Sequence, residues 1–287
     1  MAITSTTRIT GLFGDPVSHS LSPLMHNRAF GACGLDWVYV AFHVLPAHLA
    51  AAVRALPALN LAGVNVTIPH KEAVIPYLDS LSHTAAMIGA VNTIRVEADG
   101  SLTGHNTDAP GFAAALDRQG VSLDGQRLLL LGAGGAARAV AFQAAIDGAE
   151  EICLCDQVGE RAAALASDLA GHFASCRVHC IPLERAALEP AAAAATVLVN
   201  ATPVGMAGHG DYPIDLAWLH PGLFVYDLVY NPASTPLIAA ARARAIRCDN
   251  GLTMLALQGA TSFALWTGAA PPGESMIATL EELMRNR

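Results

Sequence analysis

Two separate segments of the chain carry residue types that together suit the reversible removal of hydrogen from an alcohol. The first, residues 65–72, places Lys71 just after an apolar strand pattern that Pro69 interrupts. The second is a glycine-rich turn that begins at Gly132. A dinucleotide bound at such a turn can carry a hydride but not the accompanying proton, which a partly desolvated lysine amine can accept or donate. The combination predicts an oxidoreductase that acts on an alcohol or a ketone.

The glycine-rich turn stands between an apolar strand pattern and an amphipathic helix pattern. Its residues are Gly132, Ala133, Gly134, Gly135 and Ala136, followed by Ala137. The first glycine permits the tight turn, the second lets the backbone approach a pyrophosphate, and the small Ala137 lets helix and strand pack closely. The following helix N-terminus offers free N–H groups and a positive dipole end to phosphates. Strand, turn, helix and second strand follow in order, so we interpret the turn as a nucleotide site.

Asp156 ends the next strand pattern and indicates which dinucleotide binds. A carboxylate there can accept hydrogen bonds from the adenine ribose hydroxyls and would repel a 2′-phosphate. Gln157 and Val158 follow, and no Arg or Lys stands before Arg161. We therefore predict NAD, with NADP the less favoured cofactor. The alternative is that Asp156 only caps the helix that begins near Gly159.

The apolar patterns predict an α/β protein of two domains. In the first part we expect strands over residues 9–13, 37–44 and 63–68, a hairpin over 90–97 and 101–105, and a helix over 46–59. Another helix is expected to start at Ser22-Pro23, with Ser22 as its cap and Pro23 in its first position. From residue 126, strands (127–131, 151–155, 177–181, 196–200, 224–227) alternate with helices (136–146, 160–170), which indicates a Rossmann-type doubly wound parallel sheet.

Two further helix patterns, over residues 253–266 and 274–285, end the chain without a following strand. Such a terminal pair often packs on the first domain. We therefore expect a smaller α/β substrate domain over residues 1–108, completed by C-terminal helices in 251–287, and a dinucleotide-binding domain over 109–250.

Polar residues cluster at the expected strand and helix ends of the first domain. They include the hydroxyls of Ser20, Ser22 and Thr67, the amide of Asn92 and the carboxylate of Asp108. Each alone could be a turn residue or a cap. Together with the Lys71 ammonium they suit a polyhydroxylated acid. Asp108 would orient the amine and share its proton.

The chain resembles the shikimate dehydrogenase family along nearly its whole length. The matching motifs are Ser20-Leu-Ser-Pro, Asn65-Val-Thr-Ile-Pro-His-Lys-Glu, Gly89-Ala-Val-Asn-Thr, Asn106-Thr-Asp, Gly132-Ala-Gly-Gly-Ala, Asn200-Ala-Thr, Tyr226-Asp-Leu-Val-Tyr and Gly251-Leu-Thr-Met-Leu-Ala-Leu-Gln.

The resemblance implies an active site between a substrate domain and a dinucleotide domain. It gives Lys71 and Asp108 as the catalytic pair. It implies substrate contacts from six residues: Ser20, Ser22, Thr67, Asn92, Tyr230 and Gln258. It adds Asn200, Thr202 and Gly251 to the cofactor residues of the turn and Asp156.

Two departures from the family's usual biosynthetic pattern bear on function. Those members commonly carry Asn-Arg-Thr, which holds the 2′-phosphate of NADP, where this chain has Asp156-Gln157-Val158. They also often have Gly where this chain has Thr253. The first departure favours an NAD-linked, oxidative role over aromatic amino acid biosynthesis, and the second changes a pocket wall beside Gln258.

The family implies interconversion of shikimate and 3-dehydroshikimate. Quinate, or a related cyclohexane carboxylate, is the alternative substrate, although by resemblance Ser22 favours shikimate. An alternative of another class is a catalytically silent sensor of nucleotide and ring acid, which the intact Lys71 and Asp108 disfavour.

Composition narrows the kinds of partner and ligand that we expect for the chain. The 287 residues carry a net charge of −8, and only 14% are charged while 53% are hydrophobic. The chain shows no basic cluster and no apolar run of about 18 residues, so we expect neither a nucleic-acid partner nor a membrane partner. The six cysteines and eleven histidines lack disulfide-like or zinc-like spacing, so no metal is expected. A cytoplasmic monomer or homodimer is expected.

Overall fold

The computed structural model describes residues 3–286 and divides into two compact units. Unit 1 comprises residues 1–111 and 255–287, and unit 2 comprises residues 112–254. The divisions fall inside two helices, α4 (Asp108–Arg118) and α9 (Leu252–Thr267), rather than in loops. The chain thus leaves and re-enters unit 1 through continuous helices, close to the expected divisions after residues 108 and 250.

Unit 1 is built on a mixed sheet. Among the described residues it has six strands in the order β2-β1-β3-β5-β6-β4. Strand β1 (Arg8–Gly14) lies between β2 (Trp37–His43) and β3 (Leu61–Val66) and pairs in parallel with both. The remaining strands are β4 (Ser80–Leu81), β5 (Thr93–Val96) and β6 (Leu102–His105). Because β5 runs antiparallel to both β3 and β6, this half of the sheet forms a hairpin at Asp99-Gly100, as the sequence predicts.

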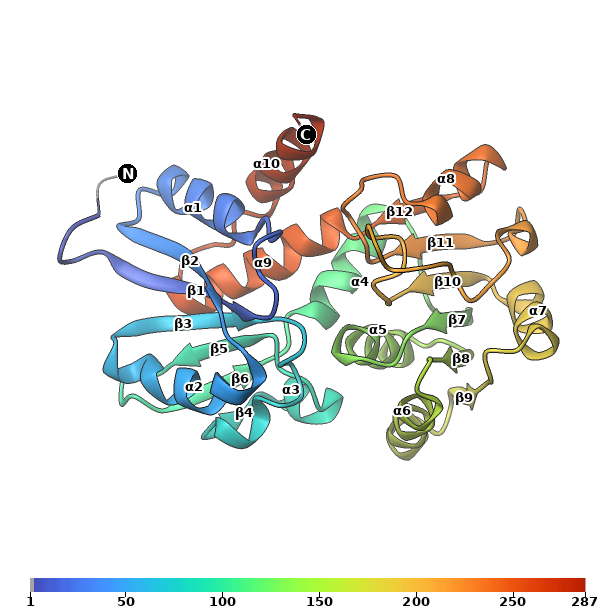
Figure 1. The fold of residues 1–287 in the computed structure, drawn as a ribbon, viewed down its shortest axis with the longest axis horizontal. Helices are drawn as coiled ribbons and strands as arrows, with labels where there is room; N and C mark the ends of the chain where they lie inside the picture. Colours follow the sequence, from blue (N-terminus) through green and yellow to red (C-terminus); the bar gives the residue numbers. More distant parts are fainter. Residues whose placement is uncertain (1–2, 287) are drawn as a thin grey trace. The chain divides into compact units, whose positions relative to one another are not determined.

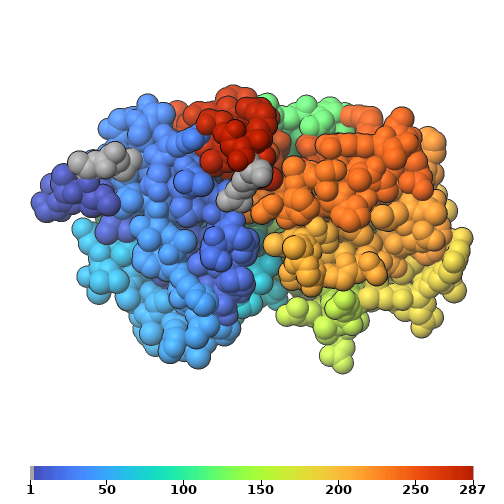
Figure 2. Space-filling model, turned by 45° about the horizontal axis from the view of Figure 1, so that its top comes forward, coloured from blue at the N-terminus to red at the C-terminus, as the bar shows by residue number. Residues whose placement is uncertain are grey.

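Helices from both ends of the chain complete unit 1 (Figures 1 and 2). The C-terminal helix α10 (Gly273–Arg285) packs against α1 (Ser22–Ala32), and Arg28 donates to Glu282 at 2.7 Å. The other helices are α2 (Leu49–Ala58) and α3 (His83–Ile88). The expected completion of the first domain by terminal helices therefore corresponds to real packing.

The predicted capping of α1 is wrong. Leu21 precedes the helix without a side-chain cap, and Ser22 is already its first residue. Ser22 is buried, and its backbone N–H donates to Ser20 Oγ at 3.2 Å. The hydroxyl of Ser22 is therefore directed into the interior of the unit rather than at the helix end.

Unit 2 has the doubly wound architecture predicted from its alternating pattern. Within the described residues its sheet has six strands, all parallel, in the order β12-β11-β10-β7-β8-β9. The strands are β7 (Arg127–Leu131), β8 (Glu151–Cys155), β9 (Arg177–Cys180), β10 (Val197–Asn200), β11 (Phe224–Asp227) and β12 (Cys248–Asn250). The helices are α5 (Gly135–Ile146), α6 (Gly159–His172), α7 (Arg185–Ala194) and α8 (Pro236–Ala243).

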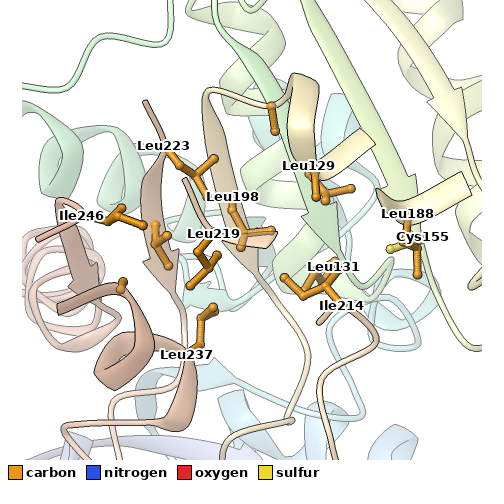
Figure 3. Close-up of a cluster of buried hydrophobic side chains, with 14 residues drawn as sticks. Leu129, Leu131, Cys155, Leu188, Leu198, Ile214, Leu219, Leu223, Leu237 and Ile246 are labelled. Atoms are coloured by element: carbon orange, nitrogen blue, oxygen red, sulfur yellow. The ribbon is translucent and has the colours of Figure 1, made fainter. Parts of the chain in front are cut away.

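The core of unit 2 joins its sheet to helices α7 and α8. Leu129 and Leu198 from two neighbouring strands lie in one cluster with Leu188 of α7 and Leu237 of α8 (Figure 3). Val225 of β11 belongs to the same cluster. The chain reverses its winding between β7 and β10, which are adjacent in the sheet. In parallel sheets, ligands bind beyond the carboxyl ends of the strands at this reversal. No helix within residues 3–286 is long and apolar enough to cross a membrane.

An aromatic cluster in unit 1 holds a histidine in neutral form. His26 is fully buried, and its ring stacks in parallel on Tyr39 with the centroids 4.4 Å apart. Phe30 and Trp266 flank the same ring. Among residues 3–286, neither ring nitrogen of His26 has a hydrogen-bond partner. Burial lowers the pKa of His26 from 6.5 to about 3.

This burial predicts an acid-sensitive stability. Between pH 6.5 and about pH 3 the unfolded chain binds a proton at His26 that the folded chain does not. The free energy of unfolding should therefore fall with falling pH, by about 1 kcal/mol for each pH unit. Urea unfolding near neutral and near pH 5, followed by Trp37 and Trp266 fluorescence in a Trp218→Phe background, would measure it. His26→Leu should remove this part of the loss, and an unchanged pH dependence in that variant would contradict the assignment.

Candidate active site

Hydrogen bonds hold the backbone of the turn after β3, which carries Lys71, in place. The Thr67 N–H donates to Phe13 O at 2.9 Å, which continues the sheet by one residue. His70 is fully buried, and its Nε2 lies 2.6 Å from Val44 O in the neighbouring loop. The Val91 N–H donates to Lys71 O at 2.8 Å. The backbone of Lys71 is therefore fixed on two sides, and only its side chain needs ordering.

Lys71 and Asp108 form an ion pair with little exposure to solvent. Lys71 Nζ lies 2.6 Å from Asp108 Oδ2, and the side chains are 14% and 8% exposed. Asp108 is the first residue of α4, so the positive end of the helix dipole also favours its carboxylate. The amide of Asn92 donates to the other oxygen, Oδ1, at 2.8 Å. Charge-assisted bonds of this kind are shorter and stronger than neutral ones, so the pair holds a defined geometry.

Asn92 links this pair to the polar residues around it. Its Oδ1 accepts from the Thr107 N–H at 2.7 Å. Its Nδ2 also contacts Thr107 Oγ1 at 2.9 Å and Gln258 Oε1 at 3.3 Å. Gln258 comes from α9, far along the chain from the other members. Four of the predicted site residues, Lys71, Asp108, Asn92 and Gln258, thus share one network.

The network continues into the interior through residues for which the sequence analysis gave no role. Asn65 Nδ2 donates to Ser262 Oγ at 2.9 Å and to Thr93 Oγ1 at 3.0 Å. Its Oδ1 accepts from the Tyr39 hydroxyl at 2.8 Å. Burial raises the pKa of Tyr39 well above its usual value, so this hydroxyl keeps its proton. Asn65 begins the motif that contains Lys71, whereas nothing in the sequence near Tyr39 or Ser262 indicates a site.

The three predicted hydroxyl residues lie on the segments that follow β1 and β3, with Ser20 and Thr67 in loops and Ser22 at the start of α1. These strands are parallel neighbours, so their following loops meet at one edge of the sheet. Asp15 N–H donates to Ile68 O at 3.0 Å between the two loops. Ser20 and Thr67 are half-buried there, while Ser22 reaches the hydroxyl of Tyr39. Ser22 is thus connected through Tyr39 and Asn65 to the network of Lys71.

Unit 2 places the glycine-rich turn at the reversal of its sheet. Gly132 follows β7 with a φ of +105°, a conformation that favours glycine, and its N–H donates to Cys155 O at 2.7 Å. A Cβ at Gly132 would lie 3.1 Å from Ala201 O and from Thr202 Cγ2. The turn is therefore packed closely against the loop that follows β10.

The backbone in the middle of the turn is open to its surroundings. A Cβ at Gly134 would meet nothing within 4 Å, so the backbone there is open. Gly135 and Ala136 begin α5, whose first N–H groups have no partner within the helix. An open glycine before a helix N-terminus fits the phosphates of a dinucleotide. Gly132–Ala136 would hold that part of the cofactor.

Asp156 is bound both to the turn and to the residue that precedes α6. Its Oδ2 accepts from the Ala133 N–H at 2.8 Å, and its Oδ1 accepts from the Val158 N–H at 2.8 Å. Helix α6 starts at Gly159 after Val158 and has no side-chain cap. The alternative reading of Asp156 as a helix cap is therefore wrong, since its carboxylate holds the glycine-rich turn against the end of β8.

The other predicted cofactor residues also lie in unit 2. Asn200 ends β10 and is fully buried, and its Oδ1 accepts from Thr202 Oγ1 at 2.6 Å. Gly251 is buried between β12 and α9, where a Cβ would collide with the backbone of Leu228. Tyr230, predicted to contact substrate, is half-buried in the loop after β11. Among residues 3–286, no group of three or more His, Cys, Asp or Glu side chains could hold a metal ion.

The fold and these sites define a class, that of dinucleotide-dependent α/β oxidoreductases. Residues 12–94 match the shikimate dehydrogenase substrate binding domain, and residues 251–281 match the shikimate 5′-dehydrogenase C-terminal domain. The chain is 47% identical to the shikimate dehydrogenase (NADP(+)) of Moorella thermoacetica, over 98% of this chain and 95% of the relative. It is also 47% identical to the enzyme of that name from Methanothermobacter thermautotrophicus, over 98% and 99%. The chain belongs to the shikimate dehydrogenase family.

Solved structures agree over nearly the full length. A shikimate dehydrogenase in complex with NADP+ has a TM-score of 0.89 and 38% identity, covering 99% of this chain and 98% of that one. Shikimate 5-dehydrogenase from Listeria monocytogenes in complex with shikimate and NAD has a TM-score of 0.88 and 36% identity, with the same coverage of both chains. Quinate dehydrogenase from Corynebacterium glutamicum in complex with NAD has a TM-score of 0.88 and 33% identity, covering 96% of this chain and 99% of that one. The two-domain α/β fold predicted from the sequence is confirmed.

The open backbone at Gly134 gives a direct test of the nucleotide site. Its φ of −79° suits any residue and a Cβ there has free space, so Gly134→Ala should leave the melting temperature nearly unchanged. The added methyl would occupy the space into which a pyrophosphate must move. We expect the dissociation constant for NAD(P), measured by calorimetry, to rise by about tenfold or more, a cost of about 1.4 kcal/mol.

Gly159→Ala provides the matched control. Gly159 also has free space for a Cβ and begins a helix of the same unit, but it lies outside the turn. Nucleotide affinity should be unchanged in this variant. Equal affinity in Gly134→Ala and the native protein would show that phosphates do not bind over Gly134.

Proposed function

We propose that the protein catalyses the NAD(P)-dependent interconversion of shikimate and 3-dehydroshikimate. The observation that carries the proposal is the Lys71–Asp108 pair, 2.6 Å apart and embedded in amides and hydroxyls. The relatives named shikimate dehydrogenase and the neighbour in complex with shikimate support this substrate. The intact pair disfavours a silent sensor, which would need neither member.

The polar residues of unit 1 would bind the ring acid. Ser20 and Thr67 from the two adjoining loops, and Ser22 from the start of α1, would donate to carboxylate or hydroxyl oxygens. Asn92 and Gln258 already hold each other and would each offer a polar group to the ring hydroxyls. Tyr230 would contribute from unit 2. Hydrogen-bonded supports of this kind fix the side chains in advance, which lowers the entropic cost of orienting the substrate.

Lys71 would move the proton of the reaction. In the reducing direction its ammonium, held on Asp108, donates a second N–H to the substrate carbonyl and gives up that proton as the alcohol forms. In the oxidising direction the amine takes the proton back from the hydroxyl. Asp108, fixed by Asn92, orients the amine and stabilises its charged form. A bound nicotinamide supplies or accepts the hydride.

The residues of unit 2 would hold the dinucleotide and select it. Gly132, Ala133, Gly134, Gly135 and Ala136 would bind the pyrophosphate, with Asn200, Thr202 and Gly251 near the nicotinamide end. Asp156 would bind the adenine ribose, and its charge would oppose a 2′-phosphate, so we propose that NAD is preferred. The two relatives named for NADP(+) and the structural neighbour in complex with NADP+ point the other way, whereas two other structural neighbours were solved with NAD.

The role of Lys71 predicts a large loss of turnover. Lys71→Ala should lower kcat by about a hundredfold or more, because a positioned acid or base typically contributes about 10²–10⁴-fold. The KM for shikimate should change little, since the other polar residues remain. Steady-state NAD(P)H formation measures both constants. A kcat within a fewfold of the native value, in a variant whose nucleotide affinity is intact, would remove Lys71 from the mechanism.

A panel of shikimate and quinate, each with NAD and NADP, tests substrate and cofactor together. We expect the highest kcat/KM for shikimate with NAD. Turnover of quinate alone would make the alternative substrate the correct one, and turnover of neither acid would overturn the proposed function. A clear preference for NADP would overturn the cofactor assignment without affecting the reaction.

Asp156→Asn tests the electrostatic origin of that preference. The single amide oxygen can still accept from one of the two backbone N–H groups, of Ala133 or Val158, and the charge that repels a 2′-phosphate is removed. The ratio of kcat/KM for NADP to that for NAD should rise by about tenfold, which corresponds to about 1.4 kcal/mol of relieved repulsion. Glu160→Gln, an exposed carboxylate at the start of α6, is the control and should leave the ratio unchanged.

A further inference from the structure

We propose that Asp227 is a positioning residue for the dinucleotide, whose carboxylate sets the loops after β10 and β11 in their binding form. Asp227 ends β11 and is fully buried, and neither the substrate chemistry nor the phosphate site uses it. The inference rests on the proposed function only in requiring a dinucleotide at the glycine-rich turn. It does not depend on which ring acid is turned over.

Both oxygens of Asp227 are occupied by donors from different segments. Oδ1 accepts from Asn200 Nδ2 at 2.8 Å and from the Val229 N–H at 3.1 Å. Oδ2 accepts from the Tyr212 hydroxyl at 3.0 Å and from Thr235 Oγ1 at 2.6 Å. The donors come from the end of β10, from the loop after it and from the loop after β11. One carboxylate therefore joins two loops at the carboxyl edge of the sheet.

The hydrogen bond between Asp227 and Asn200 connects Asp227 to the wall of the glycine-rich turn. Asn200, held by Asp227, also donates from Nδ2 to Val204 O at 2.9 Å. Its Oδ1 accepts from the Thr202 hydroxyl at 2.6 Å. Thr202 packs beside Gly132, where even one added carbon would be within 3.1 Å of its Cγ2. The wall of the turn is thus positioned through Asn200 by a residue that does not contact the turn.

The hydrogen bonds from Val229 and Thr235 to Asp227 fix the loop that carries Tyr230. Thr235 caps α8 by accepting from the Ile238 N–H at 3.3 Å, while its own hydroxyl donates to Asp227. Val229 is held through its backbone N–H. The loop between β11 and α8 is therefore attached to Asp227 at both ends. A change in Asp227 would therefore loosen the loop on which Tyr230 lies.

Stability alone is a poor explanation for this carboxylate. Burying an ionised group carries a desolvation cost, and apolar side chains of similar volume are often at least as stabilising. Burial raises the pKa of Asp227, which expresses that cost, while the hydrogen bonds from Thr235 and Asn200 oppose the rise. What the carboxylate provides, and an apolar residue could not, is a common acceptor for donors of both loops.

The test compares Asp227→Asn and Asp227→Ala with Leu237→Ala. Leu237 is fully buried in the core cluster against which Tyr212 packs, and its side chain has no hydrogen-bonding group. Its truncation therefore lowers stability while every hydrogen-bond donor to Asp227 is retained. Dissociation constants for NAD and NADP would be measured by calorimetry, with the melting temperature of each variant. We expect Asp227→Ala to weaken binding of the preferred dinucleotide by about tenfold or more, as for loss of several buried hydrogen bonds. Asp227→Asn, which keeps one acceptor oxygen, should have a smaller effect in the same direction.

The KM for shikimate at saturating dinucleotide supplies a second readout. It should rise by less than the dissociation constant of the dinucleotide, because of the substrate residues only Tyr230 lies on a loop that Asp227 holds. Weaker nucleotide binding in both Asp227 variants but not in Leu237→Ala supports the inference, and Asp227→Asn alone decides it if Asp227→Ala does not fold. Unchanged affinity in the Asp227 variants, or an equal loss in Leu237→Ala, would overturn it. If the native protein binds dinucleotide but oxidises no ring acid, the proposed function fails while this inference is still tested.

Discussion

The 2.6 Å ion pair between Lys71 and Asp108 is the interaction on which the proposed chemistry of this protein depends. A lysine on a flexible stem is a poor catalyst unless something determines where its amine lies. Here the backbone of Lys71 is bound to Val91, and Asp108 is held by the helix dipole and by Asn92. Each partner is thus positioned independently before the two meet. The short, largely buried contact follows from two rigid supports, and it leaves the remaining protons of the amine for a substrate.

Three carboxylates organise the two units in the same physical way. Asp108 accepts hydrogen bonds from an amine and an amide, and Asp156 accepts one from the backbone of the glycine-rich turn. Asp227 accepts hydrogen bonds from donors of two loops. Each stands at the end of a strand or the start of a helix, where backbone N–H groups and polar side chains are not used up by regular structure. An ionised acceptor binds such donors more strongly than a neutral one, so a few residues can order long loops.

The sequence predicted best what depends on local pattern. Strands β7, β8 and β11 lie at their predicted bounds because each is an apolar run closed by polar or glycine residues. The short strand Cys248–Asn250 was missed, since its polar residues give no strand pattern and only the neighbouring β11 makes it one. The helix expected over residues 46–59 begins instead as a separate 3₁₀ turn, Pro46–His48. The Ser22 cap was wrong because the preference of serine for helix ends was outweighed by burial against Tyr39.

Site residues in motifs were accessible from the sequence, whereas the supports behind them were not. Asn92 and Asp108 could be named because their motifs resemble a family. Ser262 and Tyr39 could not, because their partner Asn65 is distant along the chain and only the fold brings them together. The resemblance also could not show that Asp156 holds Ala133, since that bond requires the adjacent ends of β7 and β8.

The central claim is that the ammonium of Lys71 exchanges a proton with the reacting oxygen while Asp108 holds it. A crystal structure of the native protein with shikimate and an oxidised dinucleotide tests this most directly. The account predicts that Lys71 Nζ lies within hydrogen-bond reach, about 2.6–3.2 Å, of the hydroxyl that becomes the ketone, and that its contact with Asp108 is retained. A Lys71 amine directed away from that hydroxyl, with another group in its place, would contradict the account.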